Sequence, residues 1–402
     1  MKHRGQHTYK RIEAFVREYT AGLSARELQR LFDRDAQNVY SVLTREQALE
    51  REPKKGLKRL LFRLKVVFLG LSYKLTPPRR LLFAASLLFA VVGILNVTVR
   101  ETVHGRQLSV EFSPLWYLAS IGGLLFLLAL ELVDRIRVRD ELEVARELQA
   151  ELLPRQVPDL PGYRFAHSYR TANEVGGDYY DFLTLPDGRL ALMVGDASGH
   201  GMAAGLVMAI ANATWKTALD LDPAPERVLA LLNRTLCRTR GKRTFMSVFY
   251  ALLDPATGQL EYISAGHPFP FLRRADGRVE ELGEGGLPLG IRESLKLKPG
   301  TTTLSPGDLL VLYTDGLVET TDPKGMEAFG FDRLQALTAA GGAPQPLHDR
   351  ILSAFDVHSS GEPLRDDLTL VVVARVAEII QDGDGVPDAP ATAEIAAASS
   401  AS

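Results

Sequence analysis

The chain has very little cysteine and almost no excess of charge of either sign. Cys237 is the single cysteine among 402 residues, so the chain has no intrachain disulfide and is not a disulfide-stabilised secreted domain. Its 47 Lys and Arg residues nearly balance 49 Asp and Glu residues, and the net charge of -2 provides no overall attraction for nucleic acid. We therefore expect a main domain suited to a reducing compartment and no nucleic-acid partner.

Formal charges are also missing from two long stretches, Leu81 to Val99 and Phe112 to Leu130. Each stretch is long enough to span a bilayer as a helix. Arg79 and Arg80 precede the first stretch, and three arginines between positions 135 and 139 follow the second, which places both outer flanks in the cytoplasm. The sequence predicts a two-span transmembrane hairpin over 81–133, in the cytoplasmic (inner) membrane as a multi-pass protein, with the N-terminus and the rest of the chain in the cytoplasm. A buried pair of core helices is the alternative.

Four shorter segments surround these stretches and the main domain. Residues 1–55 have apolar positions at helical spacing and predict a small helical cytoplasmic segment without recognisable chemistry. Residues 56–78 mix basic and apolar side chains, which indicates either an amphipathic helix on an anionic membrane surface or the basic face of a soluble bundle. Residues 134–155 have apolar positions spaced four and three apart, typical of a coiled-coil linker that could join two chains as a homodimer. Residues 377–402 are rich in Ala, Ser, Asp and Pro and predict a disordered tail.

Residues 156–376 alternate strand-like and helix-like runs. The strand-like runs include LALMVGD, FMSVFYALLD, QLEYISA, DLLVLYTD and DLTLVVVA. Helices are expected over 201–219, 225–238, 331–338 and 346–355. This pattern predicts an α+β domain, a two-sheet β-sandwich flanked by helices, preceded by the transmembrane helical hairpin and the short coiled-coil linker.

Four aspartates lie at the edges of these strand-like runs: Asp178, Asp196, Asp315 and Asp366. Carboxylates gathered at strand ends can converge on Mg²⁺ or Mn²⁺, which prefer about six oxygen ligands. Two such ions ~4 Å apart can bridge a water molecule, lower its pKa and direct it at phosphorus. The four residues are therefore candidates for both metal binding and catalysis.

Asp-Gly pairs are also common hairpin turns, and this alternative applies within the same chain. Asp187 and Asp276 each precede a glycine between two strand-like runs in a polar turn, so we expect them to serve only as turns. Asp315 also precedes a glycine, and spacing alone leaves both interpretations open for it. The long apolar run before Asp315 and its three companions favour a metal ligand.

Six ordered motifs resemble one family: EVGGDYYDF, VGDASGHGMAAGLVMA, SAGHPFPFL, GLPLGI, LLVLYTDGLVE and RDDLTLVVV. Over about residues 145–375 the chain resembles the SpoIIE/RsbU-like branch of the metal-dependent (PPM) serine/threonine protein phosphatases. The resemblance implies two antiparallel sheets packed face to face, flanked by helices, with a centre of two divalent cations, Mn²⁺ or Mg²⁺, at one end.

The resemblance also implies a role for each candidate. Asp178 matches the family's first metal aspartate, and Asp196 matches the carboxylate that bridges both ions. Ala197 matches the residue that contributes a backbone carbonyl, while Asp315 and Asp366 match the remaining carboxylates. Other nearby acids, Asp181, Glu174 and Asp367, are expected to support the site rather than bind the metal.

The implied activity is hydrolysis of phosphoserine or phosphothreonine on another protein, with a phosphorylated STAS-type anti-sigma-factor antagonist as the substrate. His200 and His267 are open as general acids, although a structural hydrogen bond is favoured for His267. GGDYYDF also resembles the GGDEF signature of diguanylate cyclases, but a cyclase would not need the separated aspartate motifs. A catalytically silent, phosphoprotein-binding membrane scaffold is the non-enzymatic alternative.

Overall fold

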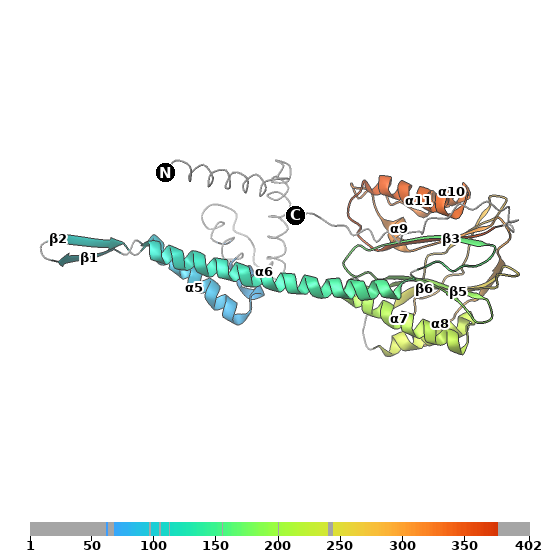
Figure 1. Ribbon diagram of the computed structural model, residues 1–402, viewed down its shortest axis with the longest axis horizontal. Helices are drawn as coiled ribbons and strands as arrows, with labels where there is room; N and C mark the ends of the chain where they lie inside the picture. The colour runs from blue at the N-terminus through green and yellow to red at the C-terminus, as the bar shows by residue number, and fades with distance from the viewer. Residues whose placement is uncertain are drawn as a thin grey trace, which may run out of the picture. The chain divides into compact units, whose positions relative to one another are not determined.

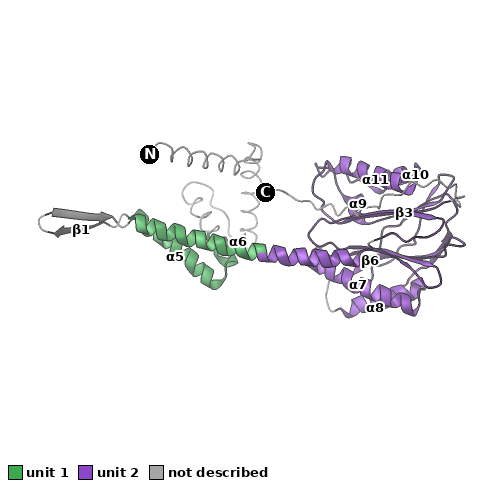
Figure 2. Ribbon diagram, in the orientation of Figure 1, with its two compact units in different colours: residues 1–136 green, residues 137–402 purple. Residues whose placement is uncertain are grey.

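The computed structural model describes residues 62, 68–95, 98–103, 106–111, 113–154, 156–199, 201–239 and 244–376. The predicted segments 1–55 and 377–402, most of 56–78, and His200 lie outside the described residues. The chain divides into two compact units, residues 1–136 and residues 137–402 (Figure 2).

In its described residues, the first unit contains a helical segment over 68–74, followed by two longer helices joined by a β-hairpin. Its elements are α5 (Pro77–Ile94), β1 (Thr98–Val103), β2 (Arg106–Glu111) and the first part of α6 (Ser113–Leu152). Strands β1 and β2 pair antiparallel. The prediction of a helical span reaching Val99 is therefore wrong, because α5 ends at Ile94 and Thr98 already begins a strand. The β-branched run from 97 to 99 explains the change, since such side chains favour strands over helices.

Helices α5 and α6 approach each other closely through small residues. A Cβ atom at Gly93 would lie 2.9 Å from the Tyr117 ring, and one at Gly123 would overlap the Ser86 hydroxyl. Such glycines let two helix backbones pack tightly.

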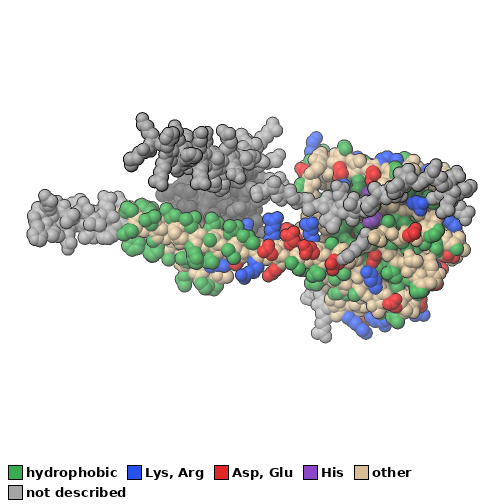
Figure 3. Space-filling model, viewed as in Figure 1, with side chains coloured by type: hydrophobic (Ala, Val, Ile, Leu, Met, Phe, Trp, Pro, Cys, Tyr) green, Lys and Arg blue, Asp and Glu red, His purple; other side chains and the backbone are tan. Residues whose placement is uncertain are grey.

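Many large apolar side chains of this helix pair are exposed on its outside. Figure 3 shows hydrophobic side chains over α5 and the first part of α6. The most exposed of them include Leu81, Leu88, Leu118 and Leu128. Both helices are long and apolar enough to cross a membrane by length and composition. The membrane crossing itself remains a prediction.

The second unit is built on two five-stranded antiparallel sheets (Figure 1). The first sheet has the order β10-β7-β6-β5-β4. Its strands are β4 (Asp178–Thr184), β5 (Leu190–Ala197), β6 (Met246–Leu253), β7 (Gln259–Ala265) and β10 (Gly300–Thr303). The second sheet has the order β3-β12-β11-β8-β9. Its strands are β3 (Tyr163–Arg170), β8 (Phe271–Arg273), β9 (Val279–Glu281), β11 (Leu309–Tyr313) and β12 (Leu368–Arg375).

Helices cover the outer face of each sheet, as Figure 1 shows. They are α7 (Met202–Leu221) and α8 (Pro225–Arg238) on the first sheet, and α9 (Asp315–Glu319), α10 (Phe331–Ala339) and α11 (Pro344–Ser359) on the second. Alternate residues of a strand point to opposite faces, so Met193 packs under α7 and α8 while Leu192 and Val194 pack between the sheets. The predicted α+β sandwich flanked by helices is confirmed.

Two arginines join the sheets at one end of this sandwich. Arg274, which follows β8, donates to the Thr302 hydroxyl and the Thr303 carbonyl of β10 in the other sheet. Arg375, at the end of β12, donates to the carbonyl of Leu304 beyond β10. We call this the arginine end.

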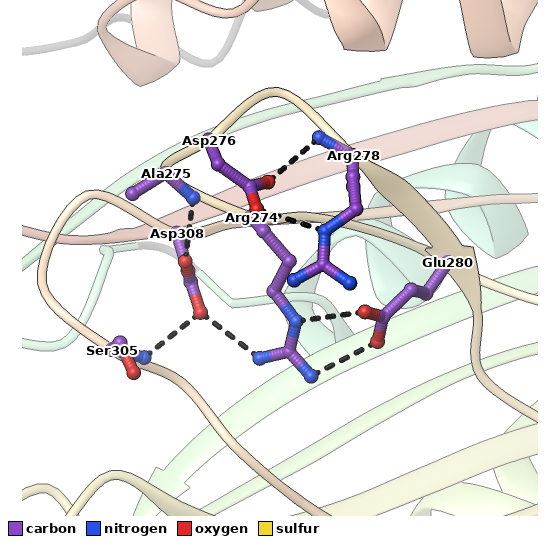
Figure 4. Close-up of a pocket in the computed structure, with 7 residues that line it drawn as sticks. All are labelled: Arg274, Ala275, Asp276, Arg278, Glu280, Ser305 and Asp308. Carbon is purple, nitrogen blue, oxygen red and sulfur yellow. Dashed lines mark hydrogen bonds and ion pairs between the residues drawn. The ribbon is translucent and has the colours of Figure 1, made fainter.

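A cavity of about 420 Å³ lies beside Arg274 at the arginine end (Figure 4). Its charged side chains bond one another: the Arg274 guanidinium bonds both Asp308 and Glu280, and Arg278 bonds Asp276. Because these charged side chains bond one another, none of the described ones that line the cavity is left to recognise a ligand.

Candidate metal centre

The four predicted aspartates lie at the opposite end of the sandwich, two on each sheet. Asp178 opens β4 and lies directly across from Asp196 near the end of β5. Asp315 comes just after β11 and Asp366 just before β12, and these two strands are paired. We call this the carboxylate end. Since antiparallel neighbours alternate in direction, a strand end and the next strand's start meet at one edge.

Asp178 is the most deeply buried of the four, with 1% of its surface exposed. Its Oδ2 atom accepts hydrogen bonds from the hydroxyls of Thr314 and Thr369, each at 2.7 Å. Burial raises the pKa of this carboxyl well above its usual range, and the neighbouring Asp196 raises it further, while the two hydroxyls oppose the shift. The two threonines bridge from the second sheet to the first.

Asp196 and Asp315 lie in a strongly acidic environment. Burial raises the pKa of Asp196 to about 8, with further contributions from Asp315 and Asp366. Burial raises the pKa of Asp315 to about 6, and Asp366 and Glu319 add to the effect. Asp366 itself is exposed and accepts a hydrogen bond from the Asp367 amide at 2.9 Å. The site thus holds several carboxylates close enough to repel one another.

Asp367 holds the glycine turn that precedes Asp178. Its carboxylate accepts hydrogen bonds from the amides of Ala172, at 2.8 Å, and Gly177, at 2.5 Å. A Cβ atom at Gly177 would come within 2.9 Å of the Ala197 carbonyl oxygen and 3.3 Å of Asp196 Oδ1. Glycine therefore lets the turn approach the Ala197 carbonyl oxygen and Asp196 Oδ1 more closely than a residue with a Cβ atom could.

Gln149 of α6 also supports this turn, and we did not predict its role from the sequence. Its side-chain amide accepts from the Gly176 amide at 2.9 Å and donates to the Gly176 carbonyl at 2.6 Å. Gln149 is polar, although it is buried and occupies a position of the predicted heptad pattern where an apolar residue is usual. A polar residue at such a position could have indicated from the sequence that its side chain has a buried hydrogen-bond partner.

His267 is buried and bonds Ser247 through Nδ1 at 2.9 Å. Ser247 lies directly opposite Asp196 on the neighbouring strand β6. Burial lowers the pKa of His267 to about 3, so the ring is neutral near pH 7 and poorly suited to act as a general acid. The structural hydrogen bond favoured from the sequence is present.

These residues suit hard divalent cations. The candidate ligands are all oxygens, four carboxylates and the Ala197 carbonyl, which Mg²⁺ and Mn²⁺ prefer. Burial is the main cause of the raised pKa values of Asp196 and Asp315, and neighbouring carboxylates add a repulsion that bound cations would relieve. Among the described residues, no three acidic, His or Cys side chains are already gathered tightly enough to hold one ion.

Comparison with known proteins identifies the domain. Residues 186–376 match the family model described as Stage II sporulation protein E (SpoIIE). Protein IcfG of Synechocystis sp. is 28% identical over 277 residues, which cover 62% of this chain and 43% of IcfG. Phosphoserine phosphatase RsbU of Bacillus subtilis is 28% identical over 243 residues, 59% of this chain and 71% of RsbU. This chain thus spans less than half of the first relative's length.

A solved structure supports the fold independently. The SiaA-PP2C domain of Pseudomonas aeruginosa superposes with a TM-score of 0.53 at 22% identity, covering 61% of this chain and 99% of that domain. The two-sheet sandwich, whose strands run from β3 to β12, is therefore a PP2C-like fold. The SpoIIE family-model match begins at residue 186, after Asp178 but before the other three candidate aspartates.

Proposed function

Because residues 186–376 belong to the SpoIIE/RsbU-like branch of the metal-dependent protein phosphatases, we propose that this chain removes phosphate from serine or threonine on another protein. Water would form the new bond to phosphorus, and the bond from phosphorus to the serine or threonine oxygen would break. The products would be inorganic phosphate and a free hydroxyl.

Two divalent cations, Mn²⁺ or Mg²⁺, would be held by Asp178, Asp196, Asp315 and Asp366 together with the Ala197 carbonyl. When bound, they would supply an activated water and positive charge against the phosphoryl oxygens. Asp196 is central because it lies opposite Asp178 and its pKa responds to both Asp315 and Asp366. The neutral, buried His267 would orient Ser247 beside Asp196 without donating a proton.

The observation that carries the proposal is that Asp196 lies opposite Asp178 on one sheet, while Asp315 and Asp366 beside the other sheet add to the rise in its pKa that burial causes. The test is phosphate release from a phosphoserine protein with Mn²⁺, comparing the unmodified chain with Asp196→Asn. We expect loss of roughly 1,000-fold in kcat/KM, the upper range for one electrostatic contact to the transition state. Equal rates would refute the assignment. A folded, Mn²⁺-binding chain without any activity would instead favour the phosphoprotein-binding scaffold.

The substrate proposal comes from the family. RsbU is named a phosphoserine phosphatase, and we propose a phosphorylated STAS-type anti-sigma-factor antagonist as the substrate here. Incubating the chain with Mn²⁺ and such a phosphoprotein, and separating its two forms by charge, would show the phosphate being removed. A control phosphoprotein of unrelated fold should react more slowly.

The remaining segments suggest a membrane-attached, regulated enzyme. Two candidate spans support attachment of residues 81–133 to the cytoplasmic membrane. We place both flanks in the cytoplasm because arginines precede the first span and follow the second. The helix α6 runs without a break from Ser113 to Leu152, so the linker at 134–155 could pair two chains and control access to the site. Inserting residues between Asp140 and Glu147 should alter activity or its regulation. Unchanged behaviour would disprove this coupling.

A further inference from the structure

We propose that Thr314 and Thr369 are positioning residues for the metal centre, which hold Asp178 through one carboxylate oxygen and direct the other toward a cation. This inference rests on the proposed function and adds two residues to it. Neither threonine is a candidate ligand, and neither was singled out from the sequence.

The hydrogen bonds place both hydroxyls on the same atom. Thr314 Oγ1 and Thr369 Oγ1 each donate to Asp178 Oδ2 at 2.7 Å. Both threonines are fully buried, and Asp178 is 1% exposed, so water does not compete with these bonds. With two donors on Oδ2, the carboxylate plane is fixed, and Oδ1 is the oxygen available to a cation.

The two threonines also hold each other. The Thr369 amide donates to Thr314 Oγ1 at 2.9 Å, and the Thr314 amide donates to the Thr369 carbonyl at 3.1 Å. Thr314 immediately precedes Asp315, and Thr369 follows Asp366 by three positions. One small network therefore connects Asp178 on the first sheet to the strand ends that carry the two aspartates of the second sheet.

This arrangement does more than give buried polar groups their hydrogen-bond partners. Hydroxyl donors leave the net charge of the site negative, whereas a lysine or arginine at either position would neutralise Asp178 and compete with a cation. Side chains that orient metal ligands typically change metal affinity 10- to 100-fold when removed. The geometry thus predicts an effect on metal binding that exceeds the effect on folding.

The test compares substitutions that keep shape with substitutions that keep the hydroxyl. Mn²⁺ binding to the full-length chain is measured by titration calorimetry for Thr314→Val, Thr369→Val, the double Val variant, and the corresponding Ser variants. We expect each Val variant to weaken the Mn²⁺ Kd ~10-fold and the double variant ~100-fold. The Ser variants should stay within about threefold of the unmodified chain, because serine retains the donor.

Thr338→Val is the matched control, because Thr338 is also fully buried but donates to the Leu334 carbonyl inside α10. It should leave Mn²⁺ affinity unchanged. Thr369→Val keeps the bond from the Thr369 amide to Thr314 Oγ1, which Thr314→Val removes, so Thr369→Val carries the test if Thr314→Val does not fold.

Three outcomes are informative. Mn²⁺ binding by the unmodified chain, weakened by Val and restored by Ser, supports the inference. Equal affinity in the Val variants, or equal weakening in the Val and Ser variants, overturns it while leaving the phosphatase proposal intact. Failure of the unmodified chain to bind Mn²⁺ overturns both, because no metal centre would then exist to position.

Discussion

Buried carboxylates at the two ends of the sandwich have different partners: a guanidinium at the arginine end, and hydroxyls or other acids at the carboxylate end. At the arginine end, Asp308 is 2% exposed and is bonded by the Arg274 guanidinium and by the amides of Ser305 and Ala275. At the carboxylate end, Asp178 has hydroxyl partners only, and Asp196 faces other acids. Paired charge at the first end stabilises the sandwich. Unpaired charge at the second costs stability and prepares a cation site.

The largest expected effect of this difference is a pH dependence of stability. The pKa of Asp196 is raised to about 8 and that of Asp315 to about 6 in the folded chain, so between pH 4 and 8 the folded state binds more protons than the unfolded state. Stability of the metal-free chain should then fall by several kcal/mol as pH rises through this range. Urea denaturation in a chelator, repeated at several pH values, measures this trend.

Saturating Mn²⁺ sharpens the test, because a bound cation favours the ionised carboxylates and stabilises the folded state. The downward trend with pH should flatten or reverse. Asp196→Asn should also flatten the trend without metal. Metal-free stability that increases steadily from pH 4 to pH 8 would contradict the pKa assignment.

The next largest effect comes from making the same Asp→Asn substitution at each end of the sandwich. Asp308→Asn removes the charge that pairs with Arg274, and we expect the free energy of unfolding to fall by ~3 kcal/mol, typical of a broken buried ion pair. Asp196→Asn should not destabilise the metal-free chain at pH 8, since it relieves repulsion. Mn²⁺ affinity measured alongside should drop only for Asp196→Asn. A reversed result would remove the distinction between the two ends.

Strand-edge carboxylates and helix positions could be predicted from the sequence, because both follow from local patterns. The expected helices over 201–219 and 225–238 are present as α7 and α8, and the aspartates do lie at strand ends. The turn interpretation of Asp276 is also supported, since its carboxylate bonds the backbone and side chain of Arg278 two residues later.

Three supporting residues, Thr314, Thr369 and Gln149, could not be predicted because their partners are distant in sequence. Thr314 lies 136 positions from Asp178, and Thr369 lies 191 positions from it. Gln149 and Gly176 are 27 positions apart, and no local pattern indicates such pairs. The end of α5 was predicted wrongly for a different reason. The stretch without formal charge continues to Val99, whereas the β-branched residues at 97–99 favour a strand and end the helix earlier.

A smaller effect is expected at Gln149, where the partners are neutral. Gln149→Ala leaves the buried amide and carbonyl of Gly176 without their side-chain partner, and we expect a loss of ~1 kcal/mol in the free energy of unfolding. Denaturation at pH 6 and pH 8 should show the same loss, because no titrating group is removed. A loss that changed with pH would place Gln149 in the charged network of the carboxylate end.

The smallest effect is expected at Asp276, which lies beside the cavity of the arginine end but belongs to an exposed turn. Its contacts with Arg278 span two residues and are open to solvent, where ion pairs contribute little. Asp276→Ala should therefore leave the denaturation midpoint unchanged, although the same end is sensitive to Asp308→Asn. A shift as large as that of Asp308→Asn would show that the whole charged cluster, rather than the buried Arg274–Asp308 pair, stabilises the arginine end.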